Sequence, residues 1–95
     1  MARSALVRAL SRLKAGEHVV FSTANDQSEI VVKATKTSPL GAVEAYGEVR
    51  AESVVGSAVA DVVISQIVDL CVKTVRRDAK LTDFERRAED GTTLR

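Results

Sequence analysis

Hydrophobic side chains recur with two different periods along the chain, and the first period is helical. Near the N-terminus the recurring apolar positions are Leu6, Ala9, Leu10 and Leu13. Their three- and four-residue spacing is that of one helix face, and Gly16 follows where a helix-ending glycine is expected. This pattern predicts a helix over residues 3–14 with an aliphatic inner face and basic residues around the rest.

The period then changes to that of strands. Residues 18–23 and 30–37 are rich in β-branched side chains, and the turn formers Asn25, Asp26 and Ser28 lie between them. We therefore expect an antiparallel hairpin over residues 17–37. The only proline, Pro39, predicts a turn, and residues 42–50 alternate apolar with polar side chains as a half-buried third strand does.

Residues 53–75 form the most apolar segment, and we interpret them as a long helix. A strand over residues 60–72 is the alternative, because apolar and polar residues also alternate there. No Gly, Pro or Asn interrupts residues 57–75, a run longer than most strands, and this length favours the helix.

The long helix is apolar on two sides, so it must be covered on two sides. One side carries Val59, Ala60, Val63, Ile67 and Leu70, and the other carries Val54, Ala58, Val62, Val68 and Val72. A line of small or polar residues crosses the second side at Ser57, Asp61, Ser65, Asp69 and Lys73. We therefore expect the first side to face the sheet and Val55, Val62 and Val72 to face a partner, although the two assignments could be exchanged. Gly56 and Ala60, one turn apart, would permit a close approach of another helix or of the sheet.

These elements predict a single α+β domain over residues 1–95, in the order α-β-β-β-α. Its three-stranded antiparallel meander would be covered by both helices. Thr82 and Glu85 have the spacing of a capping box, which predicts a short extra helix over residues 83–89. Residues 90–95 are expected to fray.

Composition narrows the function classes. The chain of 95 residues is 45% hydrophobic, carries a net charge of +1, and is only 3% aromatic, so stacking platforms for bases are nearly absent. His18 and Cys71 are its only histidine and cysteine, and no phosphate-binding or metal-ligand motif occurs. We therefore expect no enzyme, cofactor or metal site.

The long apolar run is interrupted by Asp61 and Asp69, so we expect no membrane span. The lone cysteine fits a reducing compartment, and the expected location is the cytoplasm. The acid-free, arginine-containing opening of residues 1–16 leaves organellar import as the alternative.

Two basic clusters supply the one route to nucleic acid. They consist of Arg3, Arg8 and Arg12 on the first helix and of Lys73, Arg76, Arg77 and Lys80 at the end of the long helix. Clustered cations can bind phosphates. Cations at a helix C-terminus also complement the helix dipole and need no ligand.

Two family resemblances accompany these clusters. The order helix, three strands, long helix resembles that of the YbaB-type nucleoid-associated proteins, a likeness that implies a DNA-binding dimer. Residues 56–63 are similar to the glycine-led second helix of the Alba-type nucleic-acid-binding proteins. Neither resemblance assigns a role to a particular residue.

The leading hypothesis is a non-enzymatic oligomeric binding module, either a homodimer or a complex with a partner protein. Its expected interface residues are Val55, Gly56, Val59, Val62, Val63, Ile67 and Leu70. The alternative is a small dimeric nucleic-acid-binding protein that uses the two basic clusters.

Overall fold

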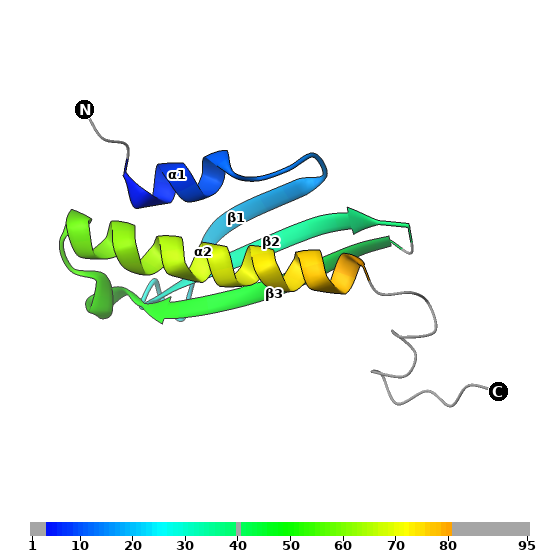
Figure 1. Ribbon diagram of the computed structural model, residues 1–95. Coiled ribbons are helices and arrows are strands. Elements are labelled where there is room, and N and C mark those ends of the chain that lie inside the picture. Colours follow the sequence, from blue (N-terminus) through cyan, green and yellow to red (C-terminus); the bar gives the residue numbers. More distant parts are fainter. Residues whose placement is uncertain (1–3, 40, 81–95) are drawn as a thin grey trace.

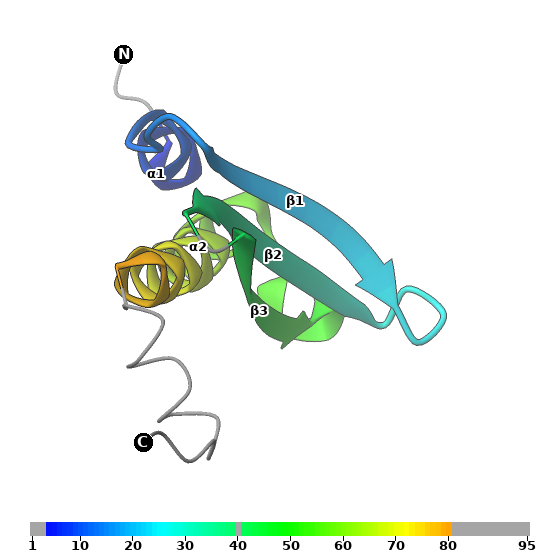
Figure 2. The same ribbon diagram turned by 90° about the vertical axis from the view of Figure 1, so that its right-hand side faces the viewer.

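The computed structural model describes residues 4–39 and 41–80, and it has the predicted α+β architecture. Helix α1 (Ala5–Ser11) precedes strands β1 (Glu17–Ala24), β2 (Glu29–Ser38) and β3 (Gly41–Arg50). A 3₁₀ turn, η1 (Ala51–Val54), leads into the long helix α2 (Ser57–Ala79). Both α-helices lie on one face of the sheet, as Figures 1 and 2 show. The expected short helix over residues 83–89 and the fraying of residues 90–95 lie outside the described residues.

The sheet is an antiparallel meander in the order β1-β2-β3, as expected. Its register aligns Val19 with Ala34 and Ala45, and Phe21 with Val32 and Gly47, and these rows face the helices. Because side chains alternate along a strand, the rows between them face away from the helices. Those outward rows include His18–Thr35–Glu44 and Val20–Lys33–Tyr46.

Helix α2 packs across β2 and β3 and continues four residues past the predicted end at Val75. The strand alternative for residues 60–72 is therefore wrong. Gly56 begins the helix at a φ of 90°, and no atom of the described residues lies within 4 Å of where a Cβ would stand. Within this chain Gly56 therefore serves the turn before the helix and does not mark a close approach to the sheet.

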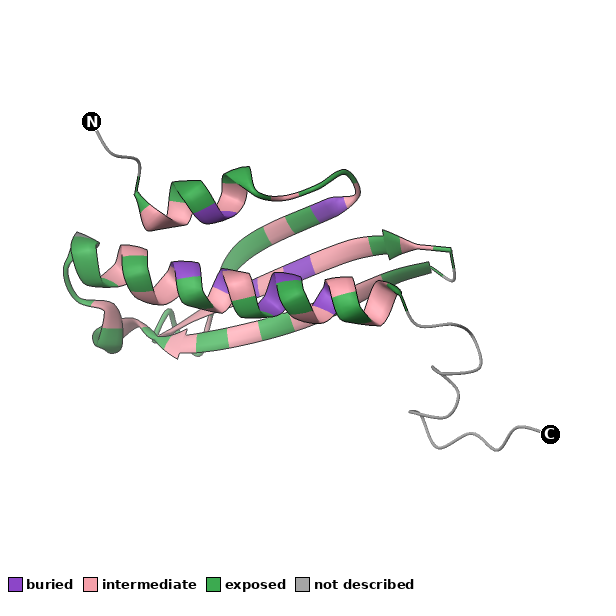
Figure 3. Cartoon of the chain, viewed as in Figure 1, coloured by how far each residue is buried: buried purple, intermediate pink, exposed green. Residues whose placement is uncertain are grey.

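The hydrophobic core lies between α2 and β2, and it is not centred on the side of α2 that we assigned to the sheet, although Ile67 of that side packs against it. The fully buried residues include Val32 in β2 and Val68 and Val75 in α2, with Cys71 and Val72 beside them. Figure 3 shows buried positions recurring along the second half of the long helix. Leu70 is 65% exposed and Val59 is 49% exposed. Our assignment of these two residues to the sheet, and of Val72 to a partner, is wrong.

Helix α1 is shorter than predicted. It ends at Ser11, and Arg12 and Leu13 continue only with short-range hydrogen bonds to Ala9 and Leu10. The chain then turns at Gly16, whose φ of 80° favours glycine, and its carbonyl accepts a hydrogen bond from Thr37 of β2. Residues 12–16 are therefore a connection that aims the chain into β1.

Candidate interaction surface

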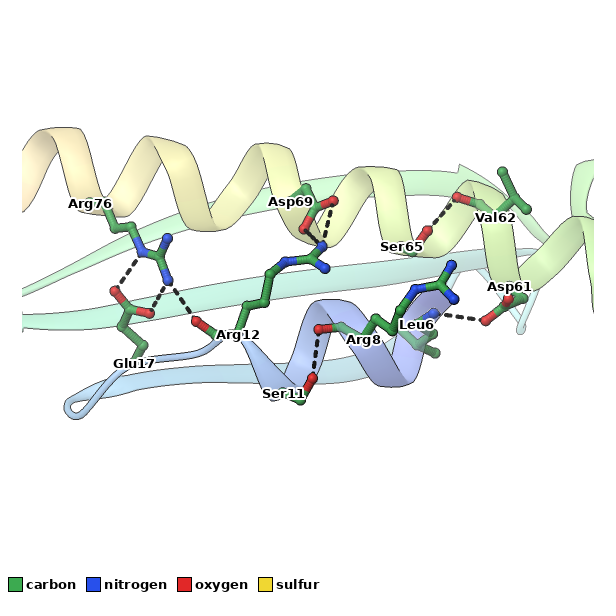
Figure 4. A network of polar contacts seen from close by, with 10 residues as sticks. All are labelled: Leu6, Arg8, Ser11, Arg12, Glu17, Asp61, Val62, Ser65, Asp69 and Arg76. Carbon is green, nitrogen blue, oxygen red and sulfur yellow. Dashed lines mark hydrogen bonds and ion pairs between the residues drawn. The ribbon is translucent and has the colours of Figure 1, made fainter. Parts of the chain in front are cut away.

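A buried carboxylate connects α2 and the residues between α1 and β1 to the sheet. Only 1% of the Glu17 side chain is exposed, and its two oxygens accept hydrogen bonds from Nε and Nη2 of Arg76, each at 2.8 Å. Lys36 Nζ lies 3.0 Å from the same carboxylate, and the backbone N–H of Lys14 donates to it at 2.8 Å. The Arg76 hydrogen bonds, against the opposing effect of burial, hold the pKa of Glu17 well below its usual range. The network joins β1, β2, α2 and the α1–β1 connection, and Figure 4 shows its two hydrogen bonds between Glu17 and Arg76.

Two acidic residues of α2 contact helix α1 and the residue that caps its C-terminus. Asp61 accepts hydrogen bonds from the backbone N–H groups of Ala5 and Leu6, both at 2.8 Å, and these bonds lower the pKa of its carboxyl. Asp69 pairs with Arg12 at 3.1 Å (Figure 4). Ser65, between them, is buried and donates to the carbonyl of Val62. Two members of the polar line that we took to weaken the second side of α2, Asp61 and Asp69, thus contact α1 and its C-cap residue Arg12.

The basic clusters are largely occupied by acids of the same chain. Arg12 pairs with Asp69, Arg76 with Glu17, and Arg77 with Asp78 at 3.0 Å. Arg8 belongs to the exposed side of α1, where Asp61 lies close enough to interact with its charge. Lys73 on α2 and Lys80 just past its end are exposed, and Arg3 lies outside the described residues. The structure therefore does not gather the seven cations into one unpaired basic surface.

The two candidate reactive residues are separated by the sheet. His18 is on the face of β1 that points away from the helices, whereas Cys71 is buried in α2 on the other side. Burial raises the pKa of the Cys71 thiol, which disfavours the reactive thiolate. The arrangement does not supply a Cys-His pair.

Four aliphatic side chains of the α2 region are exposed among the predicted interface residues. They are Val55 (75%), Leu70 (65%), Val59 (49%) and Val62 (48%). Val63 and Ile67 are half-buried, and Gly56 is exposed. We call Val59, Val63, Ile67 and Leu70 the α2 flank, since helical spacing places them along one side. The structure brings the α2 flank together, but Val55 and Val62 are not part of it.

The α2 flank borders a groove that sequence reasoning missed. Its floor is formed by residues 44–48 of β3, and its wall by Ile67, Leu70, Cys71 and Thr74 of α2. Within the described residues, β3 pairs only with β2, so its other edge is unpaired along the groove. Gly47 marks the closest approach, because a Cβ there would lie 2.4 Å from Cγ2 of Ile67. An isolated glycine in an alternating strand is the sequence signal that could have located it.

Fold and surface together define a small α+β protein with a two-helix layer on one face of a three-stranded meander. Comparisons with protein-family models, curated proteins and solved structures found no match to this chain. None of the helices in the described part of the chain combines the length and the apolar character that a membrane crossing requires.

Proposed function

We propose that this chain is a non-enzymatic assembly module, which associates with another protein chain through the α2 flank and the adjoining sheet edge. The observation that carries the proposal is Leu70, a large aliphatic side chain that is 65% exposed beside the edge of β3 that is unpaired among the described residues. Burying such a side chain contributes about 1.5–3 kcal/mol. The gain is substantial for a small domain, which buries a limited share of its own surface.

The neighbours of Leu70 support the same function. Ile67 and Val63 extend the apolar side along α2, and none of the flank residues is charged. Interface centres are typically apolar and depleted of charge, whereas their rims are polar. Glu44 and Glu48, at the two ends of the groove floor, would suit such a rim.

A photo-crosslinking amino acid at position 70 tests the proposal in the cells that normally produce the protein. We expect light to join the chain to another protein, because the probe would lie inside the interface. The same probe at Asn25, in the exposed β1–β2 turn, is the matched control and should give little product. Loss of all protein adducts at position 70 would contradict the proposed function.

Nucleic-acid binding stays the rival prediction. It requires cations that are available to phosphates. Arg12, Arg76 and Arg77 already pair with carboxylates of this chain, so the described contacts favour association with protein.

A further inference from the structure

We propose that the occupant of the groove is a second copy of this chain, which pairs its own β3 antiparallel to β3 and joins the two sheets into one of six strands. This inference rests on the proposed function and names its partner. The first support is the edge itself. Strand β3 is ten residues long, contains neither proline nor lysine, and has one unpaired edge among the described residues. Such edges pair readily with another strand.

Charge selects one register of this pairing. On the face of β3 that points away from the helices, the side chains are Glu44, Tyr46, Glu48 and Arg50. If Gly47 lies on the two-fold axis, Glu44 of each copy lies opposite Arg50 of the other, and Tyr46 lies opposite Glu48. Shifting the axis to Tyr46 would instead place Glu44 opposite Glu48. Opposite charges across strands stabilise the pair and like charges destabilise it, so the register centred on Gly47 is favoured.

The position of α2 fits this register. Neighbouring strands lie about 4.8 Å apart, so the two-fold axis would lie about 2.4 Å beyond β3. Because α2 packs across β2 and β3, a helix axis midway between these two strands would lie about one strand spacing from that two-fold axis. The two copies of α2 would then run about 10 Å apart, at the upper end of the 8–10 Å at which helices pack.

The side chains on the facing helix sides suit that distance. Ile67 lies directly over Gly47, and Leu70 projects from the same wall of the groove. In the paired form Leu70 would therefore lie near the two-fold axis and contact the α2 flank of the other copy. Ile67 occupies the space that a side chain at Gly47 would take. Because Gly47 has no side chain of its own, the strand edge carries no bulky group at the centre of the interface.

A charge exchange tests the register. The dissociation constant is measured by sedimentation equilibrium for the wild type, Glu44→Arg, Arg50→Glu and the double variant. Each single variant places like charges opposite one another twice per dimer and should weaken the dimer about tenfold or more. The double variant restores both opposite-charge pairs and should recover most of the affinity. Glu48→Arg is the matched control, because its neighbour across the interface is Tyr46, and it should change affinity much less than Glu44→Arg.

Circular dichroism of each variant checks the fold. Glu44 and Arg50 are exposed: Glu44 pairs with Lys33 at 3.7 Å and accepts a hydrogen bond from the Tyr46 hydroxyl, and Arg50 pairs with Glu52 at 3.6 Å. A wild type that remains monomeric at millimolar concentration would overturn the inference. So would a double variant as weak as the single ones. If substitution of Leu70 weakens the dimer but the charge variants leave its dissociation constant unchanged, the register is wrong and the proposed function stands. A photo-crosslinked product with a different protein likewise rejects the second copy and supports the proposed function.

Discussion

Gly47 shows how one missing side chain sets the distance between α2 and the sheet. A Cβ at this position would lie 2.4 Å from Cγ2 of Ile67 and 3.3 Å from Sγ of Cys71. The branched Ile67 side chain is stiff, and Cys71 is buried, so neither gives way easily. Gly47→Ala should therefore lower the free energy of unfolding by about 1–3 kcal/mol, the usual cost of overpacking. Urea unfolding at a fixed protein concentration measures it.

A double-mutant cycle separates this contact from a general effect of β3. Ile67→Ala removes the clashing methyl group, so its own cost should be smaller in the Gly47→Ala background by about 1 kcal/mol. Additive costs for the two substitutions would show that the Gly47–Ile67 contact does not limit the approach of α2.

At the scale of elements, Glu17 of β1 holds β2, α2 and the connection between α1 and β1 together, and its low pKa makes these contacts sensitive to acid. A carboxylate whose pKa is lower in the folded than in the unfolded chain contributes its full stability above the unfolded value, near 4.5. The contribution is lost as the pH falls below that value toward the folded pKa. Glu17→Gln should cost about 3 kcal/mol at pH 7, since it leaves the Arg76 and Lys36 charges without their partner.

The pH profile of unfolding distinguishes this cause from a simple packing defect. The difference in unfolding free energy between wild type and Glu17→Gln should shrink below about pH 4.5, because the wild-type carboxylate then takes up a proton during unfolding. A difference that stays constant from pH 7 to pH 3 would contradict the network as its source.

The helices and strands also show how much of this fold could be predicted from the sequence. Periodicity and turn residues located all three strands and α2, and the order and sheet topology are confirmed. The core side of α2 was misassigned because Asp61, Ser65 and Asp69 look like solvent-facing residues. Asp61 and Asp69 instead bind α1, and the Ser65 hydroxyl is satisfied within α2. A hydrophobic period shows which residues share a helix face but not which element covers that face. The groove beside β3 depends on how α2 packs on the sheet, so periodicity alone could not predict it.

At the scale of the whole molecule, the net charge is only +1, and several of the basic residues form ion pairs with acidic residues of the same chain. The arginines of α2 that the rival hypothesis would use, Arg76 and Arg77, are paired with Glu17 and Asp78. We expect no saturable binding of duplex DNA below about 10 µM protein in low-salt buffer, measured by fluorescence anisotropy. Tight binding that weakens steeply with added salt would instead support the nucleic-acid hypothesis.

A dimer that shares one sheet also couples folding to concentration. Because only folded chains pair, each tenfold rise in protein concentration should stabilise a chain in the dimer by about 0.7 kcal/mol. For a domain of this size that corresponds to a rise in Tm of about 3–5 °C.

Leu70→Lys would place a charge at the helix contact near the two-fold axis, while in the single chain Leu70 is already mostly exposed. Its Tm should therefore be independent of concentration and close to that of the dilute wild type in differential scanning calorimetry. Asn25→Lys, in the exposed β1–β2 turn, serves as the charge control and should keep the concentration dependence. A wild-type Tm that does not change with concentration would contradict the dimer, whereas a Leu70→Lys protein that still shows the rise would place its contact elsewhere on the molecule.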